Sequence, residues 1–333
     1  MSRQLNYSPL AFYLADQSTQ AKFGLLLIAL CYGAFLAALP VDIFADRKPY
    51  FEFIEFSPVI LLRHLSHGVH ALITNEPVWL VFNSFMGLLL EPRDVVRLII
   101  FFSASVTAYY LLRTNPKNIW WLLLFLFFPQ IVKNFVIHLR QGLAIAVFLI
   151  GWFSDSHRKK LIIVGLTPFI HASFFFVLML LAMTYLYRRM RLAGDLRNIL
   201  TIIYASALGA MLLVLARLFG ARQGSNQELA NETTSGASFL LWSLLVVLML
   251  LQGQNYLRRY SFAVSAVLFY LCIYFTSPVA GRVFESAIPL VVLAGLALTG
   301  WRRMAFLALF VGFNLLVLAM NSQKPLMGFA PGV

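Results

Sequence analysis

Long apolar blocks separated by short polar or basic connections run through the chain. The blocks lie at about 22–40, 95–112, 118–133, 141–153, 161–170, 172–187, 198–219, 238–256, 262–277, 287–300 and 304–320. Many approach the roughly 20 residues that cross a hydrocarbon core. They are apolar on all sides, whereas the strands of a membrane barrel would alternate, so the blocks indicate helices. The pattern predicts an all-α polytopic membrane protein with about 10–11 transmembrane helices.

Two features modify this simple series of spans. Blocks 161–170 and 172–187 are short and are predicted to form a hairpin broken near Pro168 and His171. Residues 41–94 form an outer segment whose apolar stretch, 57–91, we interpret as interfacial or re-entrant helices. Residues 220–237 form a second outer loop, and the whole chain, 1–333, is otherwise a single integral membrane domain.

The composition supports a membrane protein and therefore changes how the net positive charge is interpreted. The chain is 61% hydrophobic and 12% charged, with a mean hydropathy of +0.81, whereas soluble domains carry roughly 25% charged residues. The net charge of +13 would suggest nucleic acid in a soluble protein. In a membrane protein it reports orientation instead, because Lys and Arg concentrate in cytoplasmic loops. No nucleic-acid partner is therefore expected.

The basic residues define a consistent orientation. With a cytoplasmic N-terminus and alternating spans, 15 of the 26 basic residues and three of the 13 acidic residues lie inside. The cytoplasmic face then carries +12 and the outer face +1. Residues 1–21 are mostly polar, so we expect a retained first helix rather than a cleaved signal peptide. The prediction is a multi-pass protein of a bacterial inner membrane, with its chemistry facing the periplasm.

The strongest candidate site residue is Arg140. Together with Lys133 and His138, it interrupts an otherwise apolar run. An arginine at the start of a helix favours an anion, because helix N-termini attract negative charge and arginine matches phosphate oxygens in pairs. The alternative is an arginine that reaches out to a lipid headgroup.

Four other ionisable residues are candidates on the predicted outer side. His171 interrupts an apolar stretch, with a structural hydrogen bond as the alternative. Arg282 and Glu285 share a helical face, where a plain ion pair is the alternative. Glu76 precedes Pro77 at a helix start, and helix capping is its alternative role.

Metal and cofactor sites are not expected from the motifs present. His64, His67 and His70 share one predicted helical face, but no carboxylate or cysteine completes a known metal pattern. An amphipathic interfacial helix accounts for them better. The chain has no Walker loop, dinucleotide fingerprint, Gly-x-Ser-x-Gly elbow or His-Glu-x-x-His motif. We therefore predict no cofactor and no metal.

These segments resemble one known family. Arg140–Ala144 (Arg-Gln-Gly-Leu-Ala) is similar to the Arg-Gln-x-Leu-Ala segment of the EpsG family, which overlaps the Wzy-type polysaccharide polymerases. Asn75–Trp79 resembles its Glu-Pro-Gly-Phe-like segment, although Val78 stands where Gly is common. Phe169–Ser173 resembles its Phe-His-x-Ser segment, and Ala280–Glu285 its late arginine-bearing segment. The segment Asp42–Tyr50 departs from the family's Asp-Tyr-x-x-Tyr pattern, so no role is transferred to it.

The resemblance implies a GT-C-like membrane fold that polymerises undecaprenyl-pyrophosphate-linked repeat units. The growing glycan would move onto a new lipid-linked unit, with inversion. In this scheme Glu76, His171 or Glu285 is the base, with Glu76 favoured, and Arg140 and Arg282 stabilise the pyrophosphate. Further substrate contacts are implied for Gln141, His138 and Asn134. Membrane lipid, the lipid-linked oligosaccharide and possible chain-length-regulator (Wzz-type) and flippase proteins are the implied partners.

Three alternative functions remain open from the sequence. An O-antigen ligase-like glycosyltransferase shares the donor chemistry but carries a larger outer loop. A lipid-linked sugar flippase or exporter would place charges deep in several spans and on both faces. A membrane O-acyltransferase would need a histidine motif on the cytoplasmic side, where only His157 is predicted.

Overall fold

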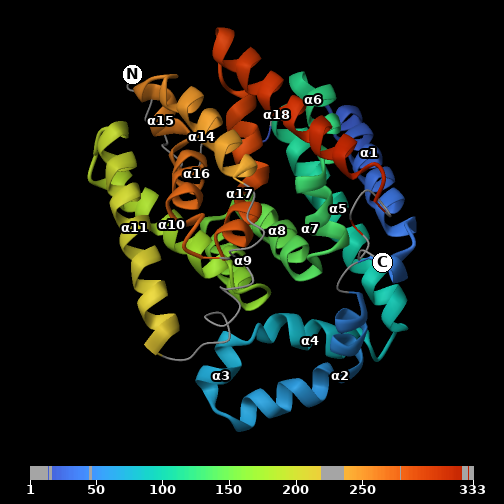
Figure 1. Cartoon of the computed structure of the whole chain (residues 1–333). Helices are drawn as coiled ribbons and strands as arrows, with labels where there is room; N and C mark the ends of the chain where they lie inside the picture. Colours follow the sequence, from blue (N-terminus) through green and yellow to red (C-terminus); the bar gives the residue numbers. More distant parts are fainter. Residues whose placement is uncertain are drawn as a thin grey trace. The chain divides into compact units, whose positions relative to one another are not determined.

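The computed structural model describes residues 14, 17–44, 47–218, 236–277, 279–324 and 329. Within these residues every regular element is a helix (Figure 1), which confirms the predicted all-helical class. Contacts divide the chain into two compact units. The first unit comprises Leu14–Phe175 and Val311–Val333, and the second contains Phe176–Phe310. The single membrane domain inferred from the sequence stays a prediction.

The first unit is built from α-helices joined by short 3₁₀ turns. Its elements are α1 (Thr19–Ala38), η1 (Val41–Ile43), α2 (Arg47–Ser66), α3 (Val69–Thr74), α4 (Pro77–Met86), α5 (Pro92–Thr114), η2 (Pro116–Asn118), α6 (Ile119–Leu126), α7 (Pro129–Val136), α8 (Leu139–Trp152), α9 (His157–Leu166) and η3 (Thr167–Phe169). Helix α5 packs against both α1 and α8, α2 packs against α4, and α8 packs against α9. The α1–α5 approach is close, because a Cβ on Gly33 would lie 2.0 Å from Ser105 Oγ.

The second unit has α16 at its centre. Its elements are α10 (Phe174–Arg189), which begins at the unit boundary, α11 (Gly194–Leu218), α14 (Ala237–Leu250), α15 (Gln254–Arg259), α16 (Ser261–Ile273), α17 (Val279–Leu296) and α18 (Gly300–Asn321), which continues into the first unit. Helix α16 contacts α11, α14 and α17. Aromatic side chains fill this core, and the Phe284 ring lies 4.5 Å from that of Trp242 and 4.4 Å from that of Tyr270.

Several helices are suited to a membrane by length and composition. Helices α1, α5 and α18 are long and apolar enough to cross one, and α6 with α7 adds a fourth if the bent pair is one span. Helices α4, α8, α14 and α16 are apolar but shorter. These findings agree with a polytopic membrane protein, while the count of 10–11 spans stays a prediction.

Two predicted spans are interrupted, which corrects the sequence interpretation. The span at 118–133 is divided into α6 and α7, whose axes differ by 70°. Pro129 is the first residue of α7, where its missing N–H costs nothing, whereas it would disrupt a continuous helix. The span at 238–256 ends at Leu250, and α15 begins after Gly253, which adopts a left-handed φ of 97°.

The segment 41–94 contains three helices separated by backbone turns. Helix α2 ends at Ser66, and Gly68 with φ 101° separates it from α3. The proposed common face of His64, His67 and His70 is therefore wrong, because they lie in α2, in the turn and in α3. The predicted break near Pro168 and His171 is confirmed, since η3 and a short turn separate α9 from α10. Most of the predicted outer loop 220–237 lies outside the described residues.

Candidate active site

Three predicted site residues come together in the first unit. Arg140 Nη1 donates a hydrogen bond to Glu76 Oε2 over 2.6 Å. His171 Nδ1 lies 2.9 Å from Glu76 Oε1, and the Ala172 backbone N–H donates to the same oxygen over 3.0 Å. Because 64 and 95 residues separate Glu76 from its two side-chain partners, the contacts join distant parts of the chain. We call this group the Glu76–Arg140–His171 cluster.

Glu76 is held in an uncommon backbone conformation. Its φ and ψ are both 55°, in the left-handed region that side chains with a Cβ rarely occupy. The following Pro77 opens α4 and disfavours the right-handed helical region for the residue before it. Glu76 occupies the capping position of α4, yet its side chain makes no capping hydrogen bond. The capping interpretation is therefore wrong, since the carboxylate contacts Arg140 and His171 instead.

The carboxylate of Glu76 is ionised at neutral pH. Burial raises its pKa, but the His171 hydrogen bond, the charges of Arg140 and His171 and the Ala172 N–H together outweigh burial. The pKa of Glu76 falls from 4.5 to about 2. Because an ionised carboxylate only accepts hydrogen bonds, His171 Nδ1 must be the donor in this pair. In the neutral imidazole the lone pair then lies on Nε2.

Arg140 is placed by the first turn of α8 and by aromatic residues of α2. Its guanidinium lies 5.3 Å from the centre of the Phe53 ring, and the Tyr50 side chain is among the groups that act electrostatically on it. The side chain of Arg140 remains 30% exposed, whereas that of Glu76 is 10% exposed. A guanidinium has five N–H donors, so the Glu76 contact leaves donors for a second anion at the exposed edge.

The sequence interpretation missed the aromatic wall beside the cluster. Tyr50 is buried and meets the Trp79 ring edge to face, with ring centres 6.1 Å apart. Arg47 is also buried, stacks over the Tyr50 ring and donates to the Val136 carbonyl. The sequence does contain a pattern that predicts this wall, because Arg47, Tyr50 and Phe53 recur every three residues and so share one helical face. The pattern was overlooked because the resemblance to the EpsG family transferred no role to Asp42–Tyr50.

The remaining candidates of the first unit lie where α7 meets α8. Asn134 is buried and donates to the Gln130 carbonyl within its own helix, and its sugar contact stays a prediction. Gln141 is buried in the first turn of α8, and half-buried His138 precedes that turn without capping it. Gly142 has a packing role, because a Cβ there would lie 2.2 Å from the Asn134 carbonyl oxygen.

Arg282 and Glu285 belong to α17 of the second unit. Arg282 is exposed and Glu285 is buried. Ser286 Oγ donates to the Arg282 carbonyl over 3.0 Å, and the neighbouring Phe284 stacks on Tyr270. The two residues therefore lie on a helix packed against α16. Their participation in one site with the Glu76–Arg140–His171 cluster stays a prediction.

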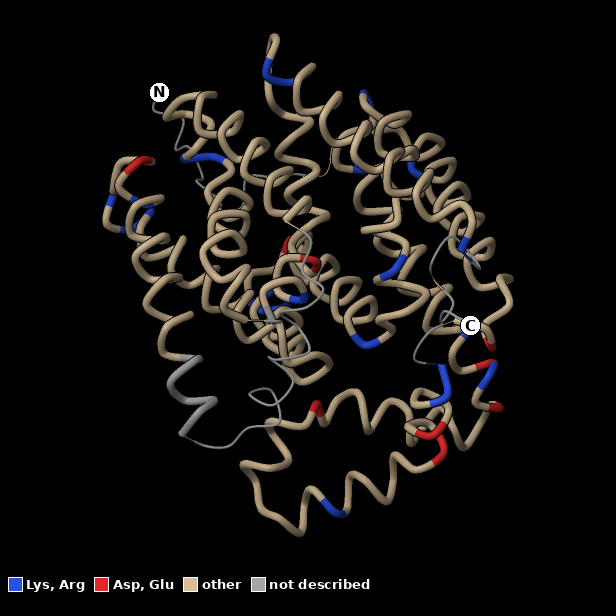
Figure 2. The backbone as a smooth tube through the Cα atoms, viewed as in Figure 1, with Lys and Arg blue, Asp and Glu red and all other residues tan. Residues whose placement is uncertain are grey.

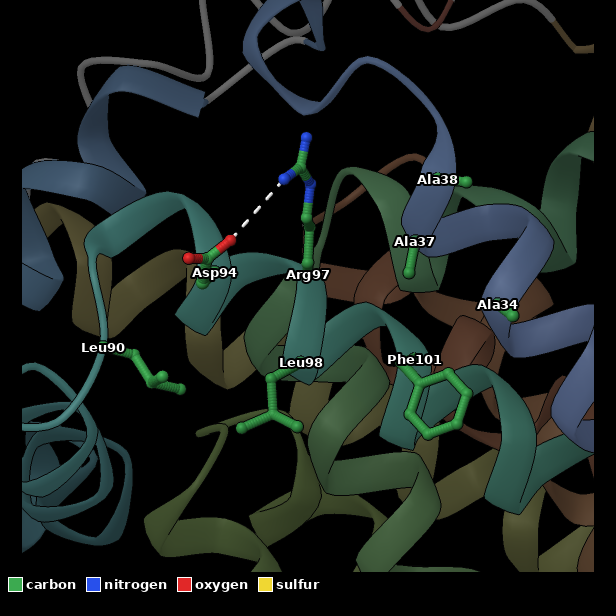
Figure 3. A pocket seen from close by; sticks show the side chains of 8 residues that line it. All are labelled: Ala34, Ala37, Ala38, Leu90, Asp94, Arg97, Leu98 and Phe101. Carbon is green, nitrogen blue, oxygen red and sulfur yellow. Dashed lines mark ion pairs between the residues drawn. The ribbon is translucent and has the colours of Figure 1, made fainter.

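An open groove of about 590 Å³ lies elsewhere in the first unit, between α1 and the start of α5 (Figure 3). Ala34, Ala37 and Phe101 contribute to its apolar lining. Arg97 and Asp94 face each other at its edge, 3.5 Å apart. None of the predicted site residues lines this groove. In the part of the chain that the structure describes, no group of three or more His, Cys, Asp or Glu side chains is arranged to hold a metal ion.

Comparisons with protein-family models, with curated proteins and with solved structures find no match for this chain. The chemistry of the cluster and the sequence resemblance therefore carry the proposed function.

Proposed function

We propose that the chain is a membrane glycosyltransferase of the Wzy-type polymerase class, acting on undecaprenyl-pyrophosphate-linked repeat units at the outer leaflet. The observation that carries the proposal is the Glu76–Arg140–His171 cluster. Three segments that separately resemble the family contribute one residue each to a single hydrogen-bonded group. A cation and a histidine–carboxylate pair are the groups that transfer from a diphosphate requires.

Arg140 is suited to stabilise the leaving group. When the bond between the anomeric carbon and the diphosphate oxygen breaks, negative charge develops on that oxygen. A partly exposed guanidinium with donors beyond its Glu76 contact can neutralise this charge without a metal.

We propose His171 as the base, although the sequence resemblance favoured Glu76. A carboxylate with a pKa of about 2 is a weak proton acceptor at neutral pH. His171 uses Nδ1 to contact Glu76, which leaves Nε2, a buried atom in this structure, as the nitrogen that would take the proton of the acceptor sugar hydroxyl. Glu76 then fixes the tautomer and stabilises the imidazolium, as the acidic member of a catalytic triad does.

The reaction balances as one displacement. The acceptor oxygen forms a bond to the anomeric carbon as its proton moves to His171 Nε2. On the opposite face, the bond to the lipid diphosphate breaks and the diphosphate leaves with the electron pair. Inversion at the anomeric carbon follows, because no covalent enzyme intermediate is formed.

The test is reconstituted chain growth with lipid-linked repeat units from the native host, resolved as a ladder on a gel. The unaltered protein should extend chains, and Arg140→Ala should lose the ladder while still inserting in the membrane. His171→Gln should lose it too, with little change in the apparent affinity for the donor. Arg97→Gln is a matched control, because it removes an exposed arginine outside the cluster.

The outcomes separate the competing functions. Full chain growth by Arg140→Ala would remove the proposed role of the cluster. Glycan transfer to another acceptor without a ladder would identify a ligase, and movement of lipid-linked units across vesicles without bond formation would identify a flippase or exporter.

A further inference from the structure

A second concentration of charge lies in the second unit and includes no residue of the proposed mechanism. The end of α10, the following turn, the start of α11 and α15 carry six arginines within segments 188–197 and 254–261, against one acidic residue, Asp195. Figure 2 shows basic positions on these elements. We call this group the arginine cluster, which consists of Arg188, Arg189, Arg191, Arg197, Arg258 and Arg259.

Direct contacts bring the two segments together. Arg188 Nη2 donates to the carbonyl oxygens of Arg258 and Arg259, both over 3.0 Å. The Gly194 backbone N–H donates to Gln254 Oε1 over 2.8 Å. A Cβ on Gly194 would lie 2.7 Å from the same oxygen, so the two segments approach closely at a glycine. The arginines therefore gather on one end of the unit rather than on scattered surfaces.

The acidic residue of these segments is already engaged. Asp195 Oδ2 accepts a hydrogen bond from the Gln254 side chain. Among the residues that the structure describes, its ion pairs include none between Asp195 and the arginine cluster. The cluster thus retains a large positive charge, and its exposed members include Arg189, Arg258 and Arg259.

Arg197 shows that this charge is partly buried. Its side chain is 6% exposed, and Nε donates to the Leu192 carbonyl over 3.0 Å. Its Nη1 is buried with no hydrogen-bond partner in the described structure. Burial and, to a smaller extent, the charge of Arg258 lower the pKa of Arg197. A buried cation is costly unless an anion compensates it.

The neighbouring helix surfaces are apolar and exposed. Leu196, Ile199 and Ile203 of α11 are 43%, 53% and 59% exposed. They recur at three- and four-residue spacing, so they form one stripe that starts beside Arg197. A small phosphate compound would use only the arginines. A phospholipid would use the arginines for its headgroup and the stripe for its acyl chains.

We propose that the arginine cluster is a binding site for the headgroup of an anionic phospholipid, with Arg197 and Arg258 as its inner contacts. Guanidinium groups match phosphate oxygens in pairs. Basic pockets between membrane helices on the cytoplasmic side recognise anionic headgroups in this way. The same arginines were assigned to the cytoplasmic face by the charge distribution, where this leaflet would supply such lipids. The site is independent of the glycosyltransferase proposal.

The test uses the full chain in detergent micelles, titrated with phosphatidylglycerol, phosphatidylcholine or inorganic pyrophosphate. Bound lipid is counted by native mass spectrometry, and the unfolding temperature is followed in parallel. Phosphatidylglycerol should bind and raise the unfolding temperature, whereas phosphatidylcholine should not, and any stabilisation by pyrophosphate should be the same in Arg258→Gln as in the unaltered protein. Arg258→Gln should weaken phosphatidylglycerol binding by about fivefold, the effect expected of one juxtamembrane charge.

The controls keep the proposal open to contradiction. Arg258 is exposed, so its replacement should leave the fold intact even if Arg197→Gln does not. Arg158→Gln removes an exposed basic residue of the first unit and should leave the affinity unchanged. Equal affinities of Arg258→Gln and the unaltered protein would overturn the proposal. An equal stabilisation by pyrophosphate that Arg258→Gln weakens would also overturn it, since the arginine cluster would then bind a free anion.

Discussion

Glu76 combines two unfavourable features that its neighbours offset. A left-handed backbone costs roughly 1–2 kcal/mol for a residue with a Cβ, and the carboxylate is also buried. A strained backbone conformation persists only when the surrounding contacts hold it in place. Hydrogen bonds to Arg140, His171 and the Ala172 N–H hold Glu76 in this conformation. The strain lies at the residue with the most contacts in the proposed site, which is where strained residues are found in enzymes.

The Glu76 contacts make stability depend on pH in a defined window. Because the pKa of Glu76 is lowered from 4.5 to about 2, the unfolded chain binds the proton first as the pH falls. The stabilisation is present above pH 4.5 and is lost as the pH falls through about 2. It amounts to about 3 kcal/mol. Unfolding in detergent should show this loss, and a Glu76→Gln variant should lack that component of it. An identical acid profile for the variant would contradict the prediction.

At the scale of an element, a substitution at Gly142 tests how α8 packs against α7. A Cβ at this position meets the backbone of Asn134, which cannot move as a flexible side chain can. Gly142→Ala should therefore separate the start of α8 from α7 and destabilise the protein by about 1–3 kcal/mol. Unfolding in detergent and chain growth would both be measured, and we expect activity to fall because α8 carries Arg140.

Gly165 provides the matched control for this substitution. It lies in α9, and a Cβ there would meet nothing within 4 Å. Gly165→Ala should be neutral or stabilise the protein by up to about 1 kcal/mol, because alanine favours a helix over glycine. Equal effects of the two substitutions would show that the close contact at Gly142 is not the cause.

The apolar blocks predict the positions of most helices but not their interruptions. Helices α1, α5 and α18 match predicted spans within a few residues, because long apolar runs have few alternatives to a helix. The break before Pro129 and the turn at Gly68 depend on single residues inside apolar or amphipathic stretches. Because hydropathy is averaged over many positions, single residues such as Pro129 do not stand out, and one span was predicted where the structure has α6 and α7.

The candidate site was predictable in its residues and not in its geometry. Polar residues that interrupt apolar blocks identified Arg140 and His171, and the helix start at Pro77 identified Glu76. Their mutual contacts depend on the left-handed turn at Glu76 and on the packing of α2 against α4, which no local pattern specifies. Tyr50 was missed because its role comes from burial beside Trp79, a contact between two helices.

At the scale of the whole molecule, the proposed chemistry depends on which side of the membrane holds Glu76. The orientation inferred from the basic residues puts segment 41–94 outside and the α10–α11 turn inside. Ser66 and Ala193 are exposed residues of these two regions. Replacing Cys31 and Cys272 with Ser allows a single new cysteine to report on each.

In intact cells, a membrane-impermeant maleimide should label Ser66→Cys, and it should label Ala193→Cys only after the membrane is permeabilised. The cysteine-free chain controls for background labelling. The reverse pattern would put Glu76 and Arg140 on the cytoplasmic side, where a donor presented on the outer leaflet cannot reach them. It would also remove the arginine cluster from the leaflet proposed to supply its lipid. One labelling experiment therefore bears on both proposed sites, because each assigns its chemistry to a particular face of the membrane.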